Sequence, residues 1–237
     1  MCFARGGFNK KTLRFIFNGE DIEVVNKFTY LGVTFASSSL FLEMSKNSNI
    51  KAKQAIGTVM ATLSKSKAVT WETRTQLYNS IVLSILLYCV QVWGLRYSDV
   101  LERVQVFFYK RLLLLPRFTP DCYLRLETGT GKLKWLIFKS CLNWLQKLLQ
   151  MPDCRLPKLC FKRNMQLHQG ADPRFNWCTQ LRSFFLEIDC LDVWSSLDVV
   201  SLKRQYTLLL DKYREKLLFG DLDAFAGTLY SGLSNIP

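Results

Sequence analysis

The spacing of hydrophobic positions changes along the chain. At the N-terminal end, the runs LRFIF (13–17) and FTYLGVTF (28–35) are short and rich in aromatic and β-branched residues. Between them lie Asn18-Gly19 and a second apolar run, IEVV (22–25). Short runs punctuated by Asn-Gly are typical of strands joined by tight turns, so this end is predicted to form a small antiparallel β element.

After Ser37-Ser38-Ser39 the apolar positions take a helical spacing. The buried face of the first helix is predicted to consist of Ile50, Ile56, Val59, Met60 and Leu63. Asn49 is placed to cap this helix, and its lysines are kept toward solvent. The pattern predicts an amphipathic helix with a basic outer face.

Two further helices are predicted before Pro116. Thr70 can cap the first, which ends near Trp93-Gly94, and Ser98 can cap the second, which Pro116 stops. The positions expected to face inward are Leu77, Tyr78, Ile81, Ile85 and Tyr88 in the first, and Leu101, Val104, Phe108 and Leu112 in the second. Three helices with short connections indicate a bundle.

The rest of the chain is also predicted to be helical, apart from one linker. Leu133 to Met151 has a helical period, and two or three helices follow, at roughly 174–190 and 199–218. Residues 152–173 hold three of the six prolines and few periodic apolar residues, which favours a linker. The predicted fold class is mainly α, with an N-terminal β-hairpin followed by a helical bundle and further C-terminal helices.

The composition is that of a globular protein from a reducing compartment. Of 237 residues, 49% are apolar and 14% aromatic, which is enough for a substantial core. None of the eight cysteines forms a CxxC pair, and Met1 is not followed by the basic end and apolar run of a signal peptide. We therefore expect an intracellular protein, in the nucleus or the cytoplasm.

The most apolar stretch, residues 81–92, is too short to span a membrane. It is about 12 residues long and contains Ser84 and Gln91, whereas a spanning helix needs ~20 apolar residues. A buried core helix is the favoured interpretation, and no membrane contact is expected. A membrane-associated protein that uses residues 80–94 is the alternative.

The charge indicates a polyanionic partner, and its distribution says which part of the chain meets it. Lys and Arg total 32 against 19 Asp and Glu, a net charge of +13, which suits nucleic acid or an anionic membrane surface. Residues 1–170 carry 25 basic and 10 acidic side chains, while residues 171–237 carry 7 basic and 9 acidic ones. A polyanion should therefore bind the first part.

Lysines gather on the first predicted helix without acidic partners. Between residues 46 and 67 there are five lysines and no Asp or Glu, so neutralising i,i+4 pairs cannot form. The five are Lys46, Lys51, Lys53, Lys65 and Lys67. Such a face is expected to follow phosphates without reading bases. An ordinary solvated helix surface is the alternative.

The segment Lys27-Phe-Thr-Tyr-Leu-Gly-Val-Thr-Phe35 resembles the strand that follows the palm in non-LTR (LINE-type) retrotransposon reverse transcriptases, where a Tyr-Leu-Gly-Val hairpin forms the primer grip. Upstream, CFARGG (2–7) resembles the end of the last palm segment. Downstream, SIVLSILLYCVQVWG (80–94) and LERVQVFFYKRLLLLPRFTP (101–120) resemble the thumb and post-thumb of that family. The resemblance covers about residues 1–150, and the ordered set of segments is far more specific than YLGV alone.

The resemblance implies a polymerase part without its catalytic centre. The family's palm holds Mg²⁺ with aspartates, two of them adjacent, because two-metal phosphoryl transfer needs carboxylates that bind both ions. This chain contains no Asp-Asp pair, so we expect no catalytic residue, no cofactor and no polymerisation by the chain alone. The catalytic part would lie upstream of Met1, and the missing palm and fingers would be partners, together with RNA and DNA.

The implied domain organisation follows the order of the family. It comprises a palm remnant and primer-grip-like hairpin (1–36), a thumb-like helical bundle (37–120), connecting helices (121–151), the linker (152–173) and a C-terminal helical region (174–237).

In the hairpin, the resemblance makes Lys27, Tyr30, Leu31 and Gly32 candidates for contact with nucleic acid. Gly32 would let the backbone approach a primer strand, and Tyr30 would pack on a sugar or base. The alternative is an edge hairpin in which Tyr30 and Val33 only cover the thumb helices.

One weak metal candidate remains. Cys154, Cys160, His168 and Cys178 have the ligand types of a zinc site, but five, seven and nine residues separate them, so no two-residue knuckle prepares a pair. Scattered free thiols are the favoured interpretation. A helical scaffold that owes its charge to solubility alone is the remaining alternative for the whole chain.

Overall fold

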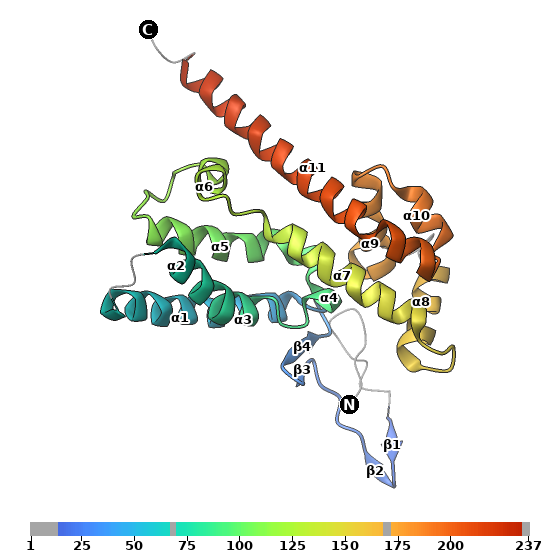
Figure 1. Cartoon of the computed structure of the whole chain (residues 1–237). Coiled ribbons are helices and arrows are strands. Elements are labelled where there is room, and N and C mark those ends of the chain that lie inside the picture. Colours follow the sequence, from blue (N-terminus) through green and yellow to red (C-terminus); the bar gives the residue numbers. More distant parts are fainter. Residues whose placement is uncertain (1–13, 67–69, 168–171, 234–237) are drawn as a thin grey trace. The chain divides into compact units, whose positions relative to one another are not determined.

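The computed structural model describes residues 14–66, 70–167 and 172–233 and is mostly helical (Figure 1). Two-stranded hairpins near the N-terminus are followed by a helical bundle and further C-terminal helices, which confirms the predicted fold class. The chain divides into two compact units, unit 1 (Met1–Cys89) and unit 2 (Val90–Pro237).

Unit 1 contains β1 (Ile16–Phe17), β2 (Glu20–Asp21), β3 (Lys27–Tyr30), β4 (Val33–Ala36), α1 (Leu42–Ser66), α2 (Trp71–Leu77), the π-helix η1 (Tyr78–Leu83) and α3 (Ser84–Leu86). Unit 2 contains α4 (Val90–Trp93), the 3-10 helix η2 (Leu95–Tyr97), α5 (Ser98–Leu112), α6 (Asp121–Thr128), α7 (Leu133–Gln150), α8 (Leu156–Leu167), the 3-10 helix η3 (Pro173–Phe175), α9 (Trp177–Glu187), α10 (Leu191–Ser196) and α11 (Val199–Leu233).

Two antiparallel hairpins confirm the predicted β element. Asn18-Gly19 joins β1 to β2, and Leu31-Gly32 joins β3 to β4, with Tyr30 opposite Val33. All four turn residues have positive φ, from 46° to 83°, as two-residue type I′ turns require. The first turn has the residues that this geometry favours, whereas the second places a leucine in the left-handed region.

Helix α1 begins at Leu42, well before the predicted cap. Asn49 therefore lies inside the helix, and Ile50, which was expected to face inward, is exposed. The predicted cap and the inward position of Ile50 are both wrong. The reason is that small residues, Ser48 and Ala52 among them, form much of the buried face that packs on β4, η1 and α3, and hydropathy alone does not mark them.

The second predicted helix starts as expected and then changes its period. The Thr70 hydroxyl accepts a hydrogen bond from the backbone N–H of Thr73 (3.3 Å), which confirms the predicted cap. The π-helix η1 has more residues per turn than an α-helix and moves the buried positions to Tyr78, Val82 and Leu86. Ile81, which was expected to face inward, is exposed for that reason, whereas Tyr88, also expected inward, is exposed in the turn that follows the end of α3 at Leu86.

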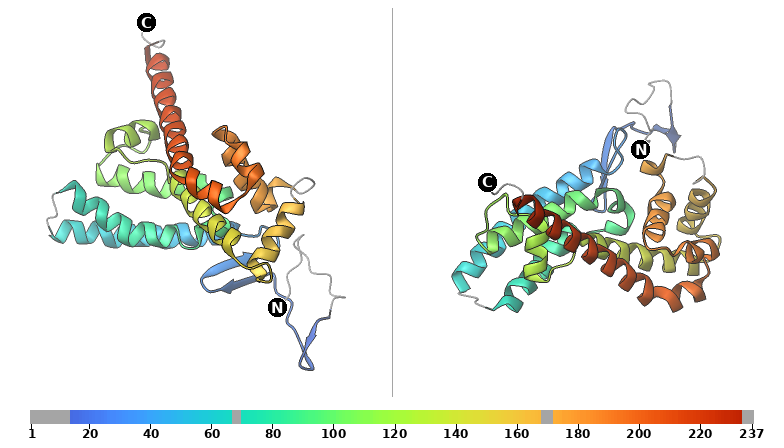
Figure 2. Two further views of the ribbon diagram at one scale, coloured as in Figure 1. Left: turned by 45° about the vertical axis from the view of Figure 1, so that its right-hand side comes forward. Right: turned by 90° about the horizontal axis from the view of Figure 1, so that it is seen from above.

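Helix α7 is the centre of unit 2. It packs against α4, α5 and α11, and the first part of α11 lies beside it (Figure 2). The core beside α7 is aromatic: the Phe138 ring lies 5.5 Å from Phe184 and 4.8 Å from Tyr213, measured between centroids. The inward positions predicted for α5 at Leu101, Val104 and Phe108 are confirmed, whereas Ser98 is the buried first residue of the helix and makes no capping hydrogen bond.

The segment predicted as a linker contains a helix. Helix α8 occupies most of residues 152–173, because a proline near the start of a helix, here Pro157, does not interrupt its hydrogen bonds. The helix is fixed at Lys158, whose buried ammonium donates to the Leu149 carbonyl at the end of α7 (2.9 Å), and at buried Phe161, which contacts Trp177.

The division between the units differs from the predicted boundary at residue 120. Helix α5 was expected to complete a bundle with the helices of unit 1, but it belongs to unit 2. Its partners explain this, because the Gln105 side chain donates to the Gly131 carbonyl (2.8 Å), and Glu102 accepts from the backbone N–H of Leu133 (2.7 Å). Over the part of the chain that the structure describes, no helix is both long enough and apolar enough to cross a bilayer.

Candidate nucleic-acid interface

The tip of the β3–β4 hairpin is exposed and strained. Tyr30 and Leu31 are 60% and 72% exposed, although both have large hydrophobic side chains. Leu31 has a φ of 46°, in the left-handed region that costs a residue with a Cβ atom roughly 1–2 kcal/mol. An exposed residue held in a strained conformation is a candidate for an intermolecular contact.

The side chain of Tyr88, in the turn after α3, contacts this tip. Its hydroxyl donates to the Leu31 carbonyl at 2.9 Å, and a Cβ atom on Gly32 would lie only 3.1 Å from Cε1 of Tyr88. The space beside Gly32 is therefore occupied by the Tyr88 ring, which belongs to unit 1. Of the two residues that the alternative interpretation expected to cover the helices, Val33 is buried and Tyr30 is not.

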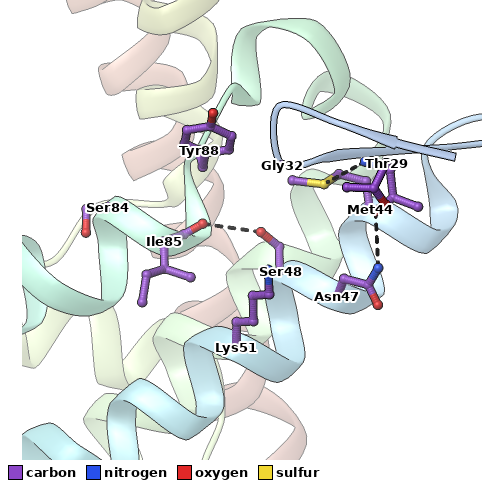
Figure 3. A pocket seen from close by; sticks show the side chains of 10 residues that line it. Thr29, Gly32, Met44, Asn47, Ser48, Lys51, Ser84, Ile85 and Tyr88 are labelled. Carbon is purple, nitrogen blue, oxygen red and sulfur yellow. Dashed lines mark hydrogen bonds between the residues drawn. The ribbon is translucent and has the colours of Figure 1, made fainter.

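A pocket of about 430 Å³ lies between the hairpin and helices α1 and α3 (Figure 3). Its lining consists of Thr29, Gly32, Thr34, Met44, Asn47, Ser48, Lys51, Ser84, Ile85 and Tyr88. The polar wall is internally bonded: the Thr29 and Thr34 hydroxyls lie 3.0 Å apart, Asn47 donates to Thr34 (3.4 Å), and Ser48 donates to the Ile85 carbonyl (3.3 Å). Lys51 is the positively charged residue of the pocket lining.

Two of the nominated lysines share one carboxylate. The ammonium groups of Lys27 and Lys46 lie 3.2 Å and 3.0 Å from Glu43. The hydrogen bonds from Lys46 and then Lys27 hold the pKa of Glu43 below its ordinary value. Both cations are thus partly neutralised, which sequence inspection missed because Glu43 lies just before the acid-free stretch.

The other lysines of α1 occupy two edges of its exposed face. Lys51, Lys53 and Lys65 are exposed, and among the described residues Lys51 and Lys65 have no acidic partner. At 3.6 residues per turn, Lys51 and Lys65 lie on nearly the same side of the helix, and Lys53 lies with Lys46 on the other edge. Lys67 is outside the described residues. The lysines of α1 therefore do not form one continuous basic face but line two separate sides of the helix.

The zinc candidates are not brought together by the described residues. Cys154 and Cys160 are exposed, whereas Cys178 is buried in unit 2, where burial raises the pKa of its thiol to about 12 and so disfavours the thiolate that zinc needs. His168 lies outside the described residues. Within those residues no group of three His, Cys, Asp or Glu side chains could hold a metal ion.

A charge network in unit 2 escaped sequence analysis. Asp221 of α11 accepts from Arg125 of α6 (2.6 Å) and lies 3.0 Å from the ammonium of Lys132, while Arg125 also reaches Glu102 of α5 (3.3 Å). Burial raises the pKa of Glu102. Burial also acts to raise the pKa of Asp221, but the hydrogen bonds from Arg125 and Lys132 outweigh this effect, so the pKa of Asp221 is lowered. The long sequence separation of Arg125 and Asp221 left no local signal.

No protein-family profile, curated protein or solved structure matches this chain. The resemblance to non-LTR reverse transcriptases therefore depends on the segments quoted above, and the site is assessed from its own geometry.

Proposed function

We propose that unit 1 binds the phosphate backbone of RNA or DNA, as part of the thumb and C-terminal region of a retrotransposon reverse transcriptase. The observation that carries this proposal is the surface of α1. Lys51 and Lys65 are exposed cations with no acidic partner among the described residues, on a helix whose opposite face is firmly packed on β4, η1 and α3. A rigid helix with free ammonium groups suits a polyanion.

The expected binding is nonspecific. Lysine is a flexible point charge that meets a phosphate without fixed geometry, unlike the bidentate contacts that read bases. Each neutralised phosphate releases counterions, so affinity falls steeply as salt rises. The exposed tip at Tyr30 and Leu31 would add a contact to sugar or base at one end of this surface.

Exposed apolar side chains in the first hairpin support the polymerase origin. Phe15, Ile16 and Phe17 are 40%, 60% and 69% exposed, which is unusual for consecutive large apolar residues. In an intact polymerase, a palm domain would cover one side of such strands. The proposal accounts for this surface as the contact with a palm domain, whereas a scaffold or interaction protein would use it for a different protein partner.

The chain alone is proposed not to polymerise. Two-metal phosphoryl transfer requires a cluster of carboxylates, and the sequence has no Asp-Asp pair. A primer-extension assay with Mg²⁺ should give no product above background. Extension that survives repeated purification would refute this part of the proposal.

Salt dependence of binding tests the backbone contact. The dissociation constant for a mixed-sequence RNA–DNA duplex is measured over a series of salt concentrations for the wild-type chain and for Lys51→Gln/Lys65→Gln. Removing two phosphate contacts should reduce the slope of log affinity against log salt by about 2.

The matched control is Lys27→Gln/Lys46→Gln, which removes the same charge from the pair that Glu43 already neutralises. Its effect on the slope should be smaller. Equal slopes for all three proteins, or binding that does not respond to salt, would contradict the proposal and favour a helical scaffold without a nucleic-acid role.

A further inference from the structure

The connection between α5 and α6 in unit 2 presents two large apolar side chains to solvent. Leu114 is 90% exposed and Phe118 is 88% exposed, more than any other large apolar side chain in the described parts of the chain. The connection runs from Leu113 to Pro120 and is called the wedge loop below (Figure 1).

The wedge loop is ordered by its own hydrogen bonds. The backbone N–H of Leu115 donates to the Lys110 carbonyl (2.8 Å), which closes the C-terminal end of α5 as a Schellman motif, and Thr119 closes a turn onto Pro116 (3.1 Å). The Lys110 ammonium donates to the Arg117 carbonyl (3.1 Å) and to Asp121 (2.7 Å), joining the two ends of the loop. The exposed side chains therefore stand on a stiff support.

Leu114 is strained where glycine would not be. It has a φ of 54° at the helix-ending position that glycine usually fills, at a cost of roughly 1–2 kcal/mol. Its side chain gains almost no burial in return, since it is nearly fully exposed. A strained residue with no packing role inside its own chain points to a contact with another molecule.

The charges beside these side chains select the kind of partner. Arg111 and Arg117 are exposed, and within the part of the chain that the structure describes neither guanidinium forms an ion pair. Two free arginines beside two free apolar side chains fit a partner that offers phosphates next to apolar surfaces. Nucleic acid does so at every step, with base faces adjoining the backbone.

We propose that the wedge loop contacts the bases of bound nucleic acid, with Phe118 stacked on a base, Leu114 beside it, and Arg111 and Arg117 on neighbouring phosphates. This inference depends on the proposed function and adds a second contact, in unit 2. Apolar side chains that separate stacked bases must be held rigidly, because unstacking costs a few kcal/mol per step. An anionic bilayer is the less suitable partner, since peripheral binding normally buries a whole apolar helix face.

The test uses the full chain and a short duplex that carries 2-aminopurine, whose fluorescence rises when the base leaves its stack. Wild-type protein should raise this fluorescence. Phe118→Ser should abolish the rise and weaken binding on the order of tenfold, the loss of one base–aromatic stack, without changing the salt slope. Arg117→Gln should instead reduce the salt slope by about 1.

The control is Phe219→Ser, which removes another exposed phenylalanine of unit 2, 62% exposed on α11, and should leave fluorescence and affinity unchanged. If Phe118→Ser matches wild type while Lys51→Gln/Lys65→Gln still lowers the salt slope, the inference fails and the proposed function stands. If wild type binds no duplex, the proposed function fails first. Binding to phosphatidylserine vesicles that Phe118→Ser abolishes, with duplex binding intact, would assign the loop to a membrane and overturn the inference.

Discussion

The hairpin tip of unit 1 and the wedge loop of unit 2 resemble each other in chemistry and differ in construction. Each holds a leucine in the left-handed region, Leu31 or Leu114, and each exposes an aromatic side chain nearby, Tyr30 or Phe118. The hairpin tip is a two-residue type I′ turn, whereas the wedge loop is a connection between two helices that begins with a Schellman motif at the end of α5. Two unrelated backbone motifs therefore produce a similar protrusion, in which a strained leucine stands beside an exposed aromatic side chain.

The supports of the two protrusions are also different. Tyr88 reaches the Leu31 carbonyl with a single side-chain hydrogen bond (2.9 Å). The wedge loop leads into α6, which Arg125 ties to Asp221 of α11 through two bonds of 2.7 and 2.6 Å. The comparison predicts a weakly held tip in unit 1 and a strongly held loop in unit 2.

The largest effect is expected for Asp221→Asn, which leaves Arg125 and Lys132 without their shared carboxylate. Breaking a buried ion pair by removing one partner should lower the free energy of unfolding by about 3 kcal/mol, measured by urea denaturation at pH 7. Glu102→Gln is the control, because its amide oxygen can still accept from Leu133, and its effect should stay below about 1 kcal/mol. If Glu102→Gln lowered the free energy of unfolding more than Asp221→Asn, Asp221 would not be the residue that contributes most to this ion-pair network.

A smaller effect is expected at the hairpin. Tyr88→Phe removes the bond to Leu31 but keeps the ring beside Gly32, so the hairpin should lose about 1 kcal/mol of local stability. Hydrogen exchange of the β3 and β4 amides should become roughly fivefold faster. Tyr30→Phe, which removes a hydroxyl from the exposed tip, should leave these rates unchanged. Equal exchange rates in the wild type and both variants would show that the Tyr88 hydroxyl does not stabilise the hairpin.

Relief of strain at the two leucines should stabilise the chain. Leu31→Asn and Leu114→Gly replace a disfavoured residue with one that suits the turn, and each should raise the free energy of unfolding by about 0.5–1 kcal/mol. Leu222→Gly, at an exposed position of α11, should lower it by about 1 kcal/mol, because glycine disfavours a helix interior. Urea denaturation measures all three, and destabilisation by Leu114→Gly would show that its side chain packs after all.

The smallest effect is a pH dependence of unit 2. Burial raises the pKa of Glu102 above its ordinary 4.5, so the folded state binds a proton more readily, and the free energy of unfolding should rise as pH falls toward 4.5. Asp221 has a pKa below 3.8, so its contribution is complete above 3.8 and lost as pH falls through the lowered value. Stability should therefore be greatest in mild acid, and Glu102→Gln should remove the rise above pH 4.5.

The fold class could be predicted because local signals agreed with the structure. Asn18-Gly19 marked a turn whose geometry those residues favour, and Thr70 marked a helix start that its hydroxyl caps. Inward positions failed where the helix changed its period, as at Ile81 in the π-helix, and where small residues such as Ala52 formed the buried face. Periodicity assumes a constant turn and a hydrophobic interior, and neither holds throughout unit 1.

The candidate site was predicted in part. The exposure of Lys51, Lys53 and Lys65 follows from helical spacing, but the sharing of Glu43 by Lys27 and Lys46 depends on the hairpin lying beside α1. Leu114 was invisible to pattern analysis, since a leucine in an apolar run is ordinarily read as core. Its strain follows from the hydrogen bonds that end α5, and a sequence pattern does not mark these bonds.

The exposed strand β1 also bears on how the chain behaves at high concentration. Among the described residues only β2 pairs with it, along one edge, so its other edge could offer backbone groups, beside exposed Ile16 and Phe17, to a strand of another molecule. Edge-to-edge pairing of this kind leads to aggregation, which a charged side chain on the edge strand, as in Ile16→Lys, commonly prevents. Exposed backbone of this kind is also where an extended segment of a partner protein could add a strand.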